Sequence, residues 1–317
     1  MRGVGAILYS GQGGQHPAMF DLVANCPEAE PVFAAAAGLL GQDPRRFVRK
    51  AAAADLYSNV PGQILCCTQA LAAWAALGTA RPARAVIAGY SVGELAACGC
   101  AGALDGPGTL RLAQRRAALM DAAAPRDGGL AAVVGLRRPI LEPILARHAV
   151  SIAIINDVDS FVIGGPRAGL EAVCQEAAAR GARRTVNLPV AVPSHTPFLH
   201  EATEQFRAVL REASPRLPRA GYRLLSGIDG DTIHDMETGI EKLARQISTT
   251  INWAACLESC QSAGAETVLE LGPGTALSHM ASALFPDGRA RAVEEFRTLA
   301  GLRTWLQRAM GSGTGVA

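Results

Sequence analysis

The sequence predicts an α/β protein in which a large domain with a parallel sheet carries a small inserted ferredoxin-like subdomain. Short apolar runs alternate with helix-like segments in the first third of the chain, which is typical of a parallel sheet covered on both faces. After a break at 124–129, the order changes to β-α-β-β-α-β, the split ferredoxin-like unit. The first pattern then returns. We therefore expect a large domain at 1–127 and 197–317, and the subdomain at 128–196.

The large domain is expected to begin with a strand at 4–9 and a glycine turn at 11–14. Its next elements are a helix at 63–78, a strand at 84–89, and helices at 92–103 and 109–122. After the subdomain come a helix at 197–213, a strand at 266–271, a turn at 272–274 and a helix at about 298–310. The last residues, 311–317, are expected to form a flexible tail.

The subdomain is expected to alternate strands and helices of similar length. Its elements are strands at 130–136, 149–155, 160–164 and 183–190, helices at 138–148 and 167–181, and a turn at 156–159.

Composition excludes several classes of function. The net charge is +2 with only two lysines, so a nucleic-acid partner is not expected. No apolar run approaches the roughly 20 residues that span a bilayer, and the short apolar run near the N-terminus resembles a buried strand more than a signal peptide. The eight cysteines lack paired CxxC spacing, which predicts a reduced, cytoplasmic protein without structural zinc.

A serine lies between two glycines where an expected strand meets an expected helix. GYSVG at 89–93 matches GxSxG, in which the glycines relieve crowding at a strained corner and the serine hydroxyl projects at the carboxyl end of the sheet. The amide of Val92 would lie at a helix N-terminus, which favours a developing oxyanion. An ordinary strand–helix turn has the same composition, but the context favours Ser91 as a nucleophile.

A serine nucleophile needs a base, and His195 is the candidate among six histidines. His148 lies at the end of an expected helix and His234 in a polar stretch, so both are expected to be structural. His195 lies in a proline-containing segment where the chain leaves the subdomain, and clefts between domains commonly bind ligands. No acidic residue is obviously placed to orient His195, and a backbone carbonyl could do so.

The glycine-rich segment GQGGQ at 11–15 does not match a phosphate-binding motif. GxGxxG would require glycine where the chain has His16, and a P-loop would require a lysine. We expect a turn whose amides, notably that of Gln12, could complete an oxyanion hole with Val92.

Arg116 is the candidate ligand for a substrate carboxylate. It lies on the expected helix 109–122, and a guanidinium pointing into the cleft would bind a carboxylate through two hydrogen bonds. A solvated arginine is the alternative. By helical periodicity Arg115 faces elsewhere, so only one of the two can point into the cleft.

Six motifs occur in a characteristic order: GQGGQ at 11–15, GYSVGE at 89–94, RAALM at 116–120, Asn156 between two strands, VPSH at 192–195 and ELGPG at 270–274. In this order they resemble the malonyl-CoA:acyl-carrier-protein transacylases, whose acyltransferase fold is shared with fatty acid and polyketide synthases. The resemblance covers about residues 4–290 and implies an α/β-hydrolase-like large domain with the inserted ferredoxin-like subdomain.

The resemblance also implies roles for individual residues. Ser91 would accept the acyl group, His195 would be its base, and Arg116 would pair with the malonyl carboxylate. The remaining roles fall to the amides of Gln12 and Val92 as oxyanion hole, to Asn252 as the residue whose carbonyl orients the histidine, and to Asn156 near the cleft. A malonyl group would pass from malonyl-CoA to the serine and then to the phosphopantetheine thiol of an acyl carrier protein, with no permanently bound cofactor and no metal.

Two departures from the family pattern suggest a narrower resemblance. Tyr90 replaces the usual histidine of GHSxGE, and Ser10 and Gly14 replace residues of the usual PGQGSQ. Together with the segment 295–306, they resemble the malonyl transferase (epsilon) subunit of bacterial malonate decarboxylase. That subunit would load a carrier protein bearing a phosphoribosyl-dephospho-CoA arm and could contact other malonate decarboxylase subunits. The alternative is a transacylase of fatty acid or polyketide synthesis.

Two other classes of protein remain as alternatives. A serine thioesterase or esterase shares GxSxG, but an α/β-hydrolase runs serine, acid, then a late histidine, whereas here a subdomain separates Ser91 from His195. A non-enzymatic docking module would not depend on Ser91 at all.

Overall fold

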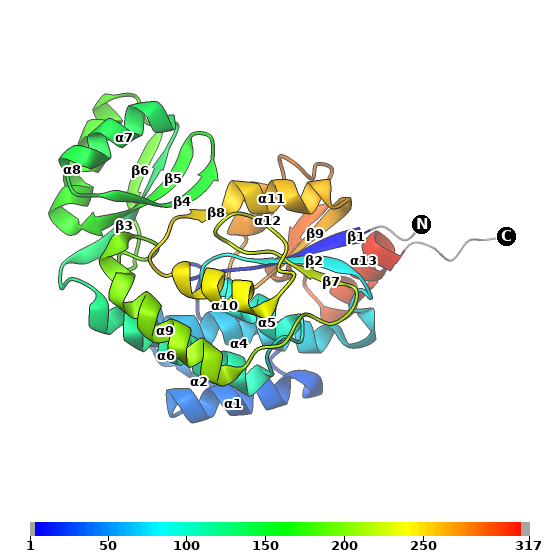
Figure 1. Ribbon diagram of the computed structural model, residues 1–317. Coiled ribbons are helices and arrows are strands. Elements are labelled where there is room, and N and C mark those ends of the chain that lie inside the picture. The colour runs from blue at the N-terminus through cyan, green and yellow to red at the C-terminus, as the bar shows by residue number, and fades with distance from the viewer. Residues whose placement is uncertain (1–3, 312–317) are drawn as a thin grey trace.

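The computed structural model describes residues 4–311, and the strands of this range form two separate five-stranded sheets (Figure 1). The first sheet contains, in spatial order, β10 (Ala290–Ala292), β9 (Ala265–Leu271), β1 (Val4–Tyr9), β2 (Ala85–Gly89) and β7 (Tyr222–Leu224). All neighbouring strands of this sheet run parallel. The α/β fold with a parallel sheet that the sequence predicts is therefore confirmed.

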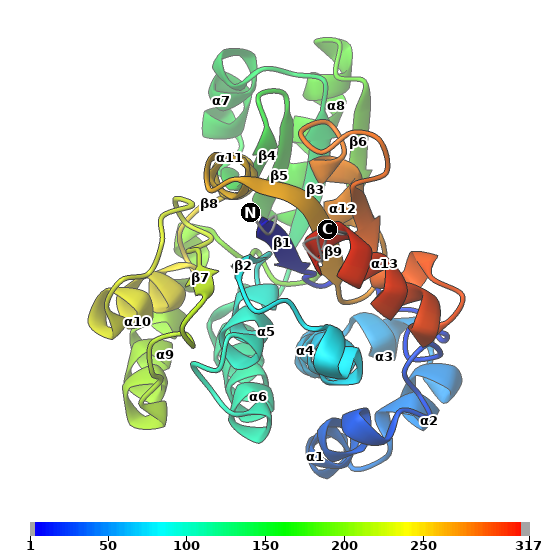
Figure 2. The ribbon, with the colours of Figure 1, turned by 90° about the vertical axis from the view of Figure 1, so that its right-hand side faces the viewer.

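Helices pack around both sheets (Figure 2). In the described range they are α1 (Glu30–Leu40), α2 (Pro44–Lys50), α3 (Ala53–Tyr57), α4 (Asn59–Leu77), α5 (Gly93–Cys100), α6 (Gly106–Ala123), α7 (Arg138–Arg147), α8 (Arg167–Ala179), α9 (His200–Ala213), α10 (Met236–Arg245), α11 (Trp253–Ser262), α12 (Ala276–Ala281) and α13 (Leu299–Gly311).

The central strand β1 sends alternate side chains into two different cores. Ile7 and Tyr9 pack on one face with residues of α4, α5 and α6. Ala6 and Leu8 pack on the other face with residues of α11, α12 and the second sheet. Because both faces are buried, β1 and β2 consist of continuous apolar runs rather than alternating ones.

The second sheet contains, in spatial order, β6 (Arg184–Asn187), β3 (Gly128–Val134), β5 (Ser160–Pro166), β4 (Ser151–Asp157) and β8 (Ile251–Asn252). The first four strands pair antiparallel, and α7 and α8 share a core with them, as expected for a β-α-β-β-α-β unit. The fifth strand, β8, comes from the C-terminal half of the chain and pairs parallel with β4. The expected subdomain, 128–196, does not include β8. Its boundaries remain a prediction.

Several expected elements differ from the observed ones. The sequence missed α1, α2, α3, α10, α11, α12, β7, β8 and β10. The expected turn at 156–159 begins two residues too early, because β4 continues through Asp157. The expected strand at 183–190 is shorter, ending at Asn187. The expected flexible tail lies, apart from Gly311, outside the described residues.

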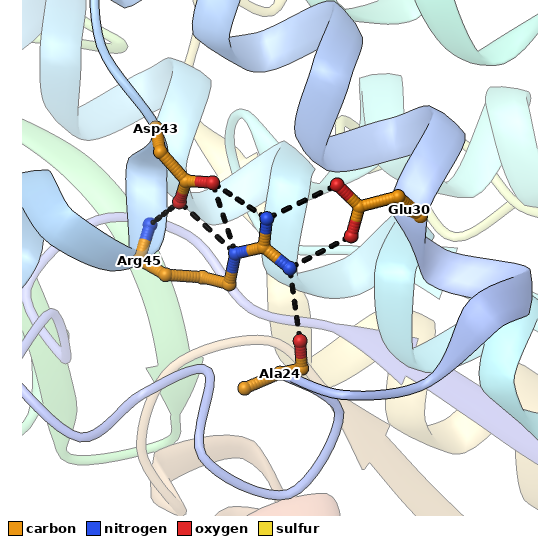
Figure 3. A network of polar contacts seen from close by, with 4 residues as sticks. All are labelled: Ala24, Glu30, Asp43 and Arg45. Carbon is orange, nitrogen blue, oxygen red and sulfur yellow. Dashed lines mark hydrogen bonds and ion pairs between the residues drawn. The ribbon is translucent and has the colours of Figure 1, made fainter.

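Arg45, at the start of α2, ties together the N-terminal helical segment (Figure 3). Its guanidinium donates to the carbonyl of Ala24 at 2.9 Å and to both oxygens of Glu30 at 2.8 and 3.1 Å. It also bonds Asp43, whose carboxylate caps α2 through the Arg45 amide at 2.8 Å. All five guanidinium donor positions can be used in this arrangement, which fixes α2 against the chain that leads into α1.

The helix α4 lies in the middle of the first core. With the turn that follows it, Asn59–Ala80 is long and apolar enough to cross a membrane by length and composition, but 83% of its most apolar window is buried inside the fold. Two of its polar side chains bond within the helix, Thr68 to the carbonyl of Ile64 at 2.7 Å and Gln63 to Asn59 at 2.8 Å.

Candidate active site

Ser91 occupies a sharp corner between β2 and α5. Its φ of 56° lies in the left-handed region, which is strained for a residue with a side chain. The two flanking glycines are sterically required. A Cβ at Gly89 would lie 2.2 Å from the Glu94 nitrogen, and one at Gly93 would lie 2.1 Å from the Tyr9 oxygen. The GxSxG pattern thus follows from close packing of the corner against β1 and the first turn of α5.

The structure brings His195 to Ser91, with 2.8 Å between His195 Nε2 and Ser91 Oγ. His195 also has a positive φ, 64°, and its amide donates to the Ile247 carbonyl at 2.8 Å. Its Nδ1 lies 2.6 Å from the carbonyl oxygen of Gln246. A carbonyl only accepts, so Nδ1 carries the proton and Nε2 is left to accept the serine proton.

The surroundings keep His195 neutral. Burial and, to a smaller extent, the nearby Arg116 cation lower the pKa of His195 to about 3, against the opposing effect of the Gln246 carbonyl. The ring is therefore unprotonated at neutral pH, which is the state that a general base requires.

The expectation that the Asn252 carbonyl orients His195 is wrong. The carbonyl belongs to Gln246, in the turn after α10, which approaches His195 before the chain reaches β8. Asn252 lies in β8, where its amide donates to the Gly227 carbonyl at 2.9 Å and its side chain caps α11 by accepting from the Ala255 amide at 3.2 Å. Asn252 therefore has a structural position at the start of α11.

The backbone amides of Gln12 and Val92 lie beside Ser91 and donate to no acceptor in the described part of the chain. Val92 precedes the first residue of α5, where helix amides lack internal partners. Gly11, before Gln12, packs closely against this corner, since a Cβ there would lie 2.7 Å from the Tyr90 carbonyl oxygen. The arrangement can therefore stabilise negative charge on an oxygen held next to Ser91.

Arg116 is fully buried, whereas its neighbour Arg115 is exposed. Its Nη1 donates to Gln63 Oε1 at 2.8 Å and its Nη2 to Gln246 Oε1 at 2.9 Å, while Nε has no acceptor. Burial lowers the pKa of Arg116 to about 10, so the side chain stays cationic at neutral pH. The site thus holds a buried cation that is bonded only to neutral amide oxygens.

A second buried donor, Gln12 Nε2, also has no acceptor. It lies close to Gly62, since a Cβ on Gly62 would be 2.7 Å from it, and Gly62 precedes the Gln63 that bonds Arg116. Five buried side-chain polar atoms of the described residues have no partner, and these two are both donors next to Gln63, which favours a ligand that brings an acceptor.

Asn156 lies at an irregularity in β4, where the pairing with β5 skips from Ile155 to Asp157. Such bulges re-aim a side chain, and here Asn156 Oδ1 accepts from the Tyr90 hydroxyl at 3.1 Å. The Tyr90 ring packs edge-on against Trp253 at 5.3 Å. Tyr90, next to the nucleophile, thus connects the corner at Ser91 to the second sheet.

Three polar residues of the site were missed by the sequence reasoning: Gln63, Glu94 and Gln246. All three are buried, and they surround Arg116 and His195 through hydrogen bonds. Glu94 could have been noticed, because it ends the GYSVGE motif. Gln63 lies on α4 and Gln246 in the turn after α10, and no sequence motif marks either position.

Ser91 and His195 line a cavity of about 560 Å³ between the two sheets. One wall comes from β3, β4, β5 and β6, and the other from the loops that follow β1, β2 and β9. Within residues 4–311, no three histidine, cysteine, aspartate or glutamate side chains gather as a metal site would require.

The loop after β9 explains the ELGPG motif and the two unusual residues near the N-terminus. Glu270 is buried, accepts from the Ser10 hydroxyl at 2.8 Å, and caps α12 through the amides of Leu277 and Ser278. Gly14 lies against Pro273, where a Cβ would be 2.4 Å from the carbonyl oxygen. Ser10 and Gly14 therefore fit the packing of this loop.

Comparison with known proteins gives a consistent result. Residues 7–285 match the family model described as an acyl transferase domain. The malonyl CoA-acyl carrier protein transacylase of Escherichia coli K12 is 29% identical over 305 residues, covering 92% of this chain and 96% of that protein. The enzyme of the same name from Salmonella typhimurium is 28% identical over 302 residues, covering 92% and 96%.

Solved structures show the same similarity over the whole fold. The acyl-carrier-protein S-malonyltransferase of Burkholderia pseudomallei superposes with a TM-score of 0.86 at 27% identity, covering 95% of this chain and 99% of that chain. A malonyl-transacylase in complex with a type II PKS acyl-carrier protein superposes with a TM-score of 0.86 at 25% identity, covering 98% and 100%.

Proposed function

This chain belongs to the acyl transferase domain family, and from that membership we propose that it moves a malonyl group from malonyl-CoA to the thiol of an acyl carrier protein. The observation that supports the choice of acyl group is Arg116, a buried cation with an unpaired donor. It bonds Gln246, the residue whose carbonyl bonds the base His195. Support for the acceptor comes from the malonyl CoA-acyl carrier protein transacylases that this chain resembles along most of its length.

The first half-reaction forms an acyl-serine. Ser91 Oγ attacks the thioester carbon while His195 Nε2 takes the hydroxyl proton, and the amides of Gln12 and Val92 stabilise the oxyanion of the tetrahedral intermediate. The intermediate collapses when the carbon–sulfur bond breaks. The proton held by His195 passes to the departing CoA thiolate, leaving malonyl on Ser91.

The second half-reaction reverses these roles. The thiol of the carrier attacks the acyl-serine, and His195 takes the thiol proton and returns it to Ser91 Oγ as the ester bond breaks. Arg116 would bind the malonyl carboxylate in both halves. A neutral acyl group would leave this buried cation unpaired, which favours malonyl over acetyl.

The proposed acceptor is the phosphopantetheine arm of a carrier of fatty acid or polyketide synthesis. The similar proteins described above favour this acceptor over the carrier of malonate decarboxylase. The features that suggest the malonate decarboxylase subunit are Tyr90, Ser10, Gly14 and the segment 295–306. Transfer to both purified carriers should be compared directly. Faster loading of the carrier with a phosphoribosyl-dephospho-CoA arm would restore the malonate decarboxylase assignment.

We also propose that the protein acts in a reducing cytoplasm, which its eight free cysteines support.

The proposal is tested by mixing the protein with radiolabelled malonyl-CoA and measuring label that survives denaturation. We expect about one label per chain on the wild type and none on Ser91→Ala. Ser194→Ala is a matched control, since Ser194 lines the same cavity and makes one long bond, 3.4 Å, to the Val192 carbonyl. Equal labelling of Ser91→Ala and wild type would refute the nucleophile, and rapid hydrolysis without transfer would indicate a thioesterase.

A further inference from the structure

Gln246 forms hydrogen bonds with the base His195, the nucleophile Ser91 and the buried Arg116. Its carbonyl accepts from His195 Nδ1, and its side-chain Oε1 accepts from Arg116 Nη2 at 2.9 Å. Its side-chain Nε2 donates to Glu94 Oε2 and, at 3.3 Å, to the Ser91 carbonyl. Gln246 is 0% exposed, so no water competes for these bonds.

The partners of Gln246 allow its amide only one orientation. A guanidinium can only donate and a carboxylate can only accept, so Oε1 must face Arg116 and Nε2 must face Glu94. Glu94 is itself fixed, because its Oε2 also accepts from the Gly227 amide at 3.1 Å. The position of the Glu94 carboxylate therefore determines where the Gln246 amide, and with it Arg116 Nη2, is held.

Glu94 also supplies charge. Arg116 bonds no carboxylate, and two acidic groups act on it: the Cys67 thiol, which stays neutral because burial raises its pKa to about 12, and Glu94, across the Gln246 amide. A buried cation without a nearby anion is strongly disfavoured. Without the negative charge of Glu94, Arg116 would be held less firmly in the orientation that a substrate carboxylate needs.

We propose that Glu94 is a positioning residue that fixes the acyl selectivity of the enzyme by holding Arg116 in place through the Gln246 side chain. The inference rests on the proposed function, because it requires Arg116 to bind the acyl carboxylate. The contact to His195 uses the Gln246 main chain instead, which the backbone holds independently of Glu94. Loss of Glu94 should therefore reduce malonyl transfer and spare the reactivity of Ser91.

The test uses Glu94→Gln, which keeps the shape and removes the charge, and measures the rates of Ser91 malonylation, acetylation and phosphonylation by a small fluorophosphonate. We expect the ratio of malonylation to acetylation to fall at least about tenfold, the value of a charge-assisted contact, while phosphonylation stays within about twofold. Gln246→Met removes the bridge from its other end and keeps the carbonyl, so it should give the same fall in ratio. Glu270→Gln, the matched buried glutamate, should leave the ratio unchanged.

A pH series supplies a readout that a purely structural role would not change. Burial raises the pKa of Glu94 to about 7, against the opposing effects of its hydrogen bonds and Arg116. The other titratable groups that interact electrostatically with Glu94 are Asp229, Cys98 and Cys256. The two thiols stay neutral because burial raises their pKa. Below pH 7 Glu94 loses its charge, so the wild-type ratio should fall between pH 8 and 6, whereas Glu94→Gln should show no such change.

The outcomes separate this inference from the function on which it rests. A wild type that takes no malonyl on Ser91 overturns the proposed function and the inference together. A wild type that is malonylated, with an unchanged ratio in Glu94→Gln, overturns the inference alone. Loss of phosphonylation in Glu94→Gln also overturns it, because Glu94 would then support the whole site rather than Arg116.

Discussion

Replacing Arg116 with methionine is expected to abolish the preference for malonyl while leaving Ser91 reactive. Methionine is unbranched and apolar, so it fills most of the space of this fully buried side chain without leaving a large cavity. The variant removes the cation together with its bonds to Gln63 and Gln246.

The magnitude follows from the donors that Arg116 has free. Two of its five N–H donors are used by Gln63 and Gln246, which leaves up to three for a carboxylate. Truncating one partner of a buried, hydrogen-bonded charge pair costs about 2 to 5 kcal/mol. We expect about 3 kcal/mol here, or roughly 150-fold in the rate of malonylation. Acetylation should not fall, because removing Arg116 also removes a cation that lowers the pKa of His195.

The assay is single-turnover formation of acyl-Ser91, followed by intact-protein mass with malonyl-CoA and with acetyl-CoA. Arg115→Met is the control, since Arg115 lies one residue away on the same helix and is exposed. An equal loss of malonylation and acetylation in Arg116→Met would remove Arg116 from the carboxylate role. Unchanged malonylation would do the same.

Two further predictions follow from the site. Tyr90→Phe removes the bond to Asn156 and keeps the ring against Trp253, so the free energy of unfolding in urea should fall by about 1 kcal/mol. The rate of Ser91 acylation should change less than about fivefold. A loss of acylation above a hundredfold would mean that the hydroxyl takes part in the reaction. The lowered pKa of His195, about 3 against an ordinary 6.5, means that the unfolded chain binds more protons in this window. This contribution to stability is present above pH 6.5 and is lost as the pH falls toward 3. Because the ring stays neutral, the rate of Ser91 phosphonylation should stay level from pH 8 to 5. A decline in that rate centred near pH 6.5 would contradict the lowered pKa of His195.

The central strands of the fold and the corner at Ser91 can be predicted from the sequence because each has a strong local pattern. The continuous apolar runs of β1 and β2 and the glycines around Ser91 are each required by packing that can be inferred one segment at a time. The helices α10 and α11 were both missed, although α10 has a buried apolar face with Ile240 and Leu243 and a cap at Asp235. Strand β8 is only two residues long, and its existence depends on the distant β4.

The same distinction applies to the site. Ser91 and His195 lie in recognisable motifs, and the structure brings them within hydrogen-bond distance. The carbonyl partner of His195 was assigned to Asn252 instead of Gln246 because any residue can supply a carbonyl, so no residue type marks the position. Glutamines buried around a charge, such as Gln63 and Gln246, can be recognised only once α4 and the turn after α10 are packed against Arg116 of α6.

The pairing of β8 with β4 limits how this fold can be recombined with its relatives. A chimera that exchanged residues 128–196 alone would place a foreign β4 beside the original Ile251–Asn252, at the position where Ile154 pairs with Ile251. The same two residues lead directly into α11, whose Trp253 packs against Tyr90. A crossover that carries residues 246–253 along with the inserted segment would keep the β4–β8 pair and the Gln246 carbonyl with His195 from a single parent, but it would place Trp253 against the Tyr90 of the other parent.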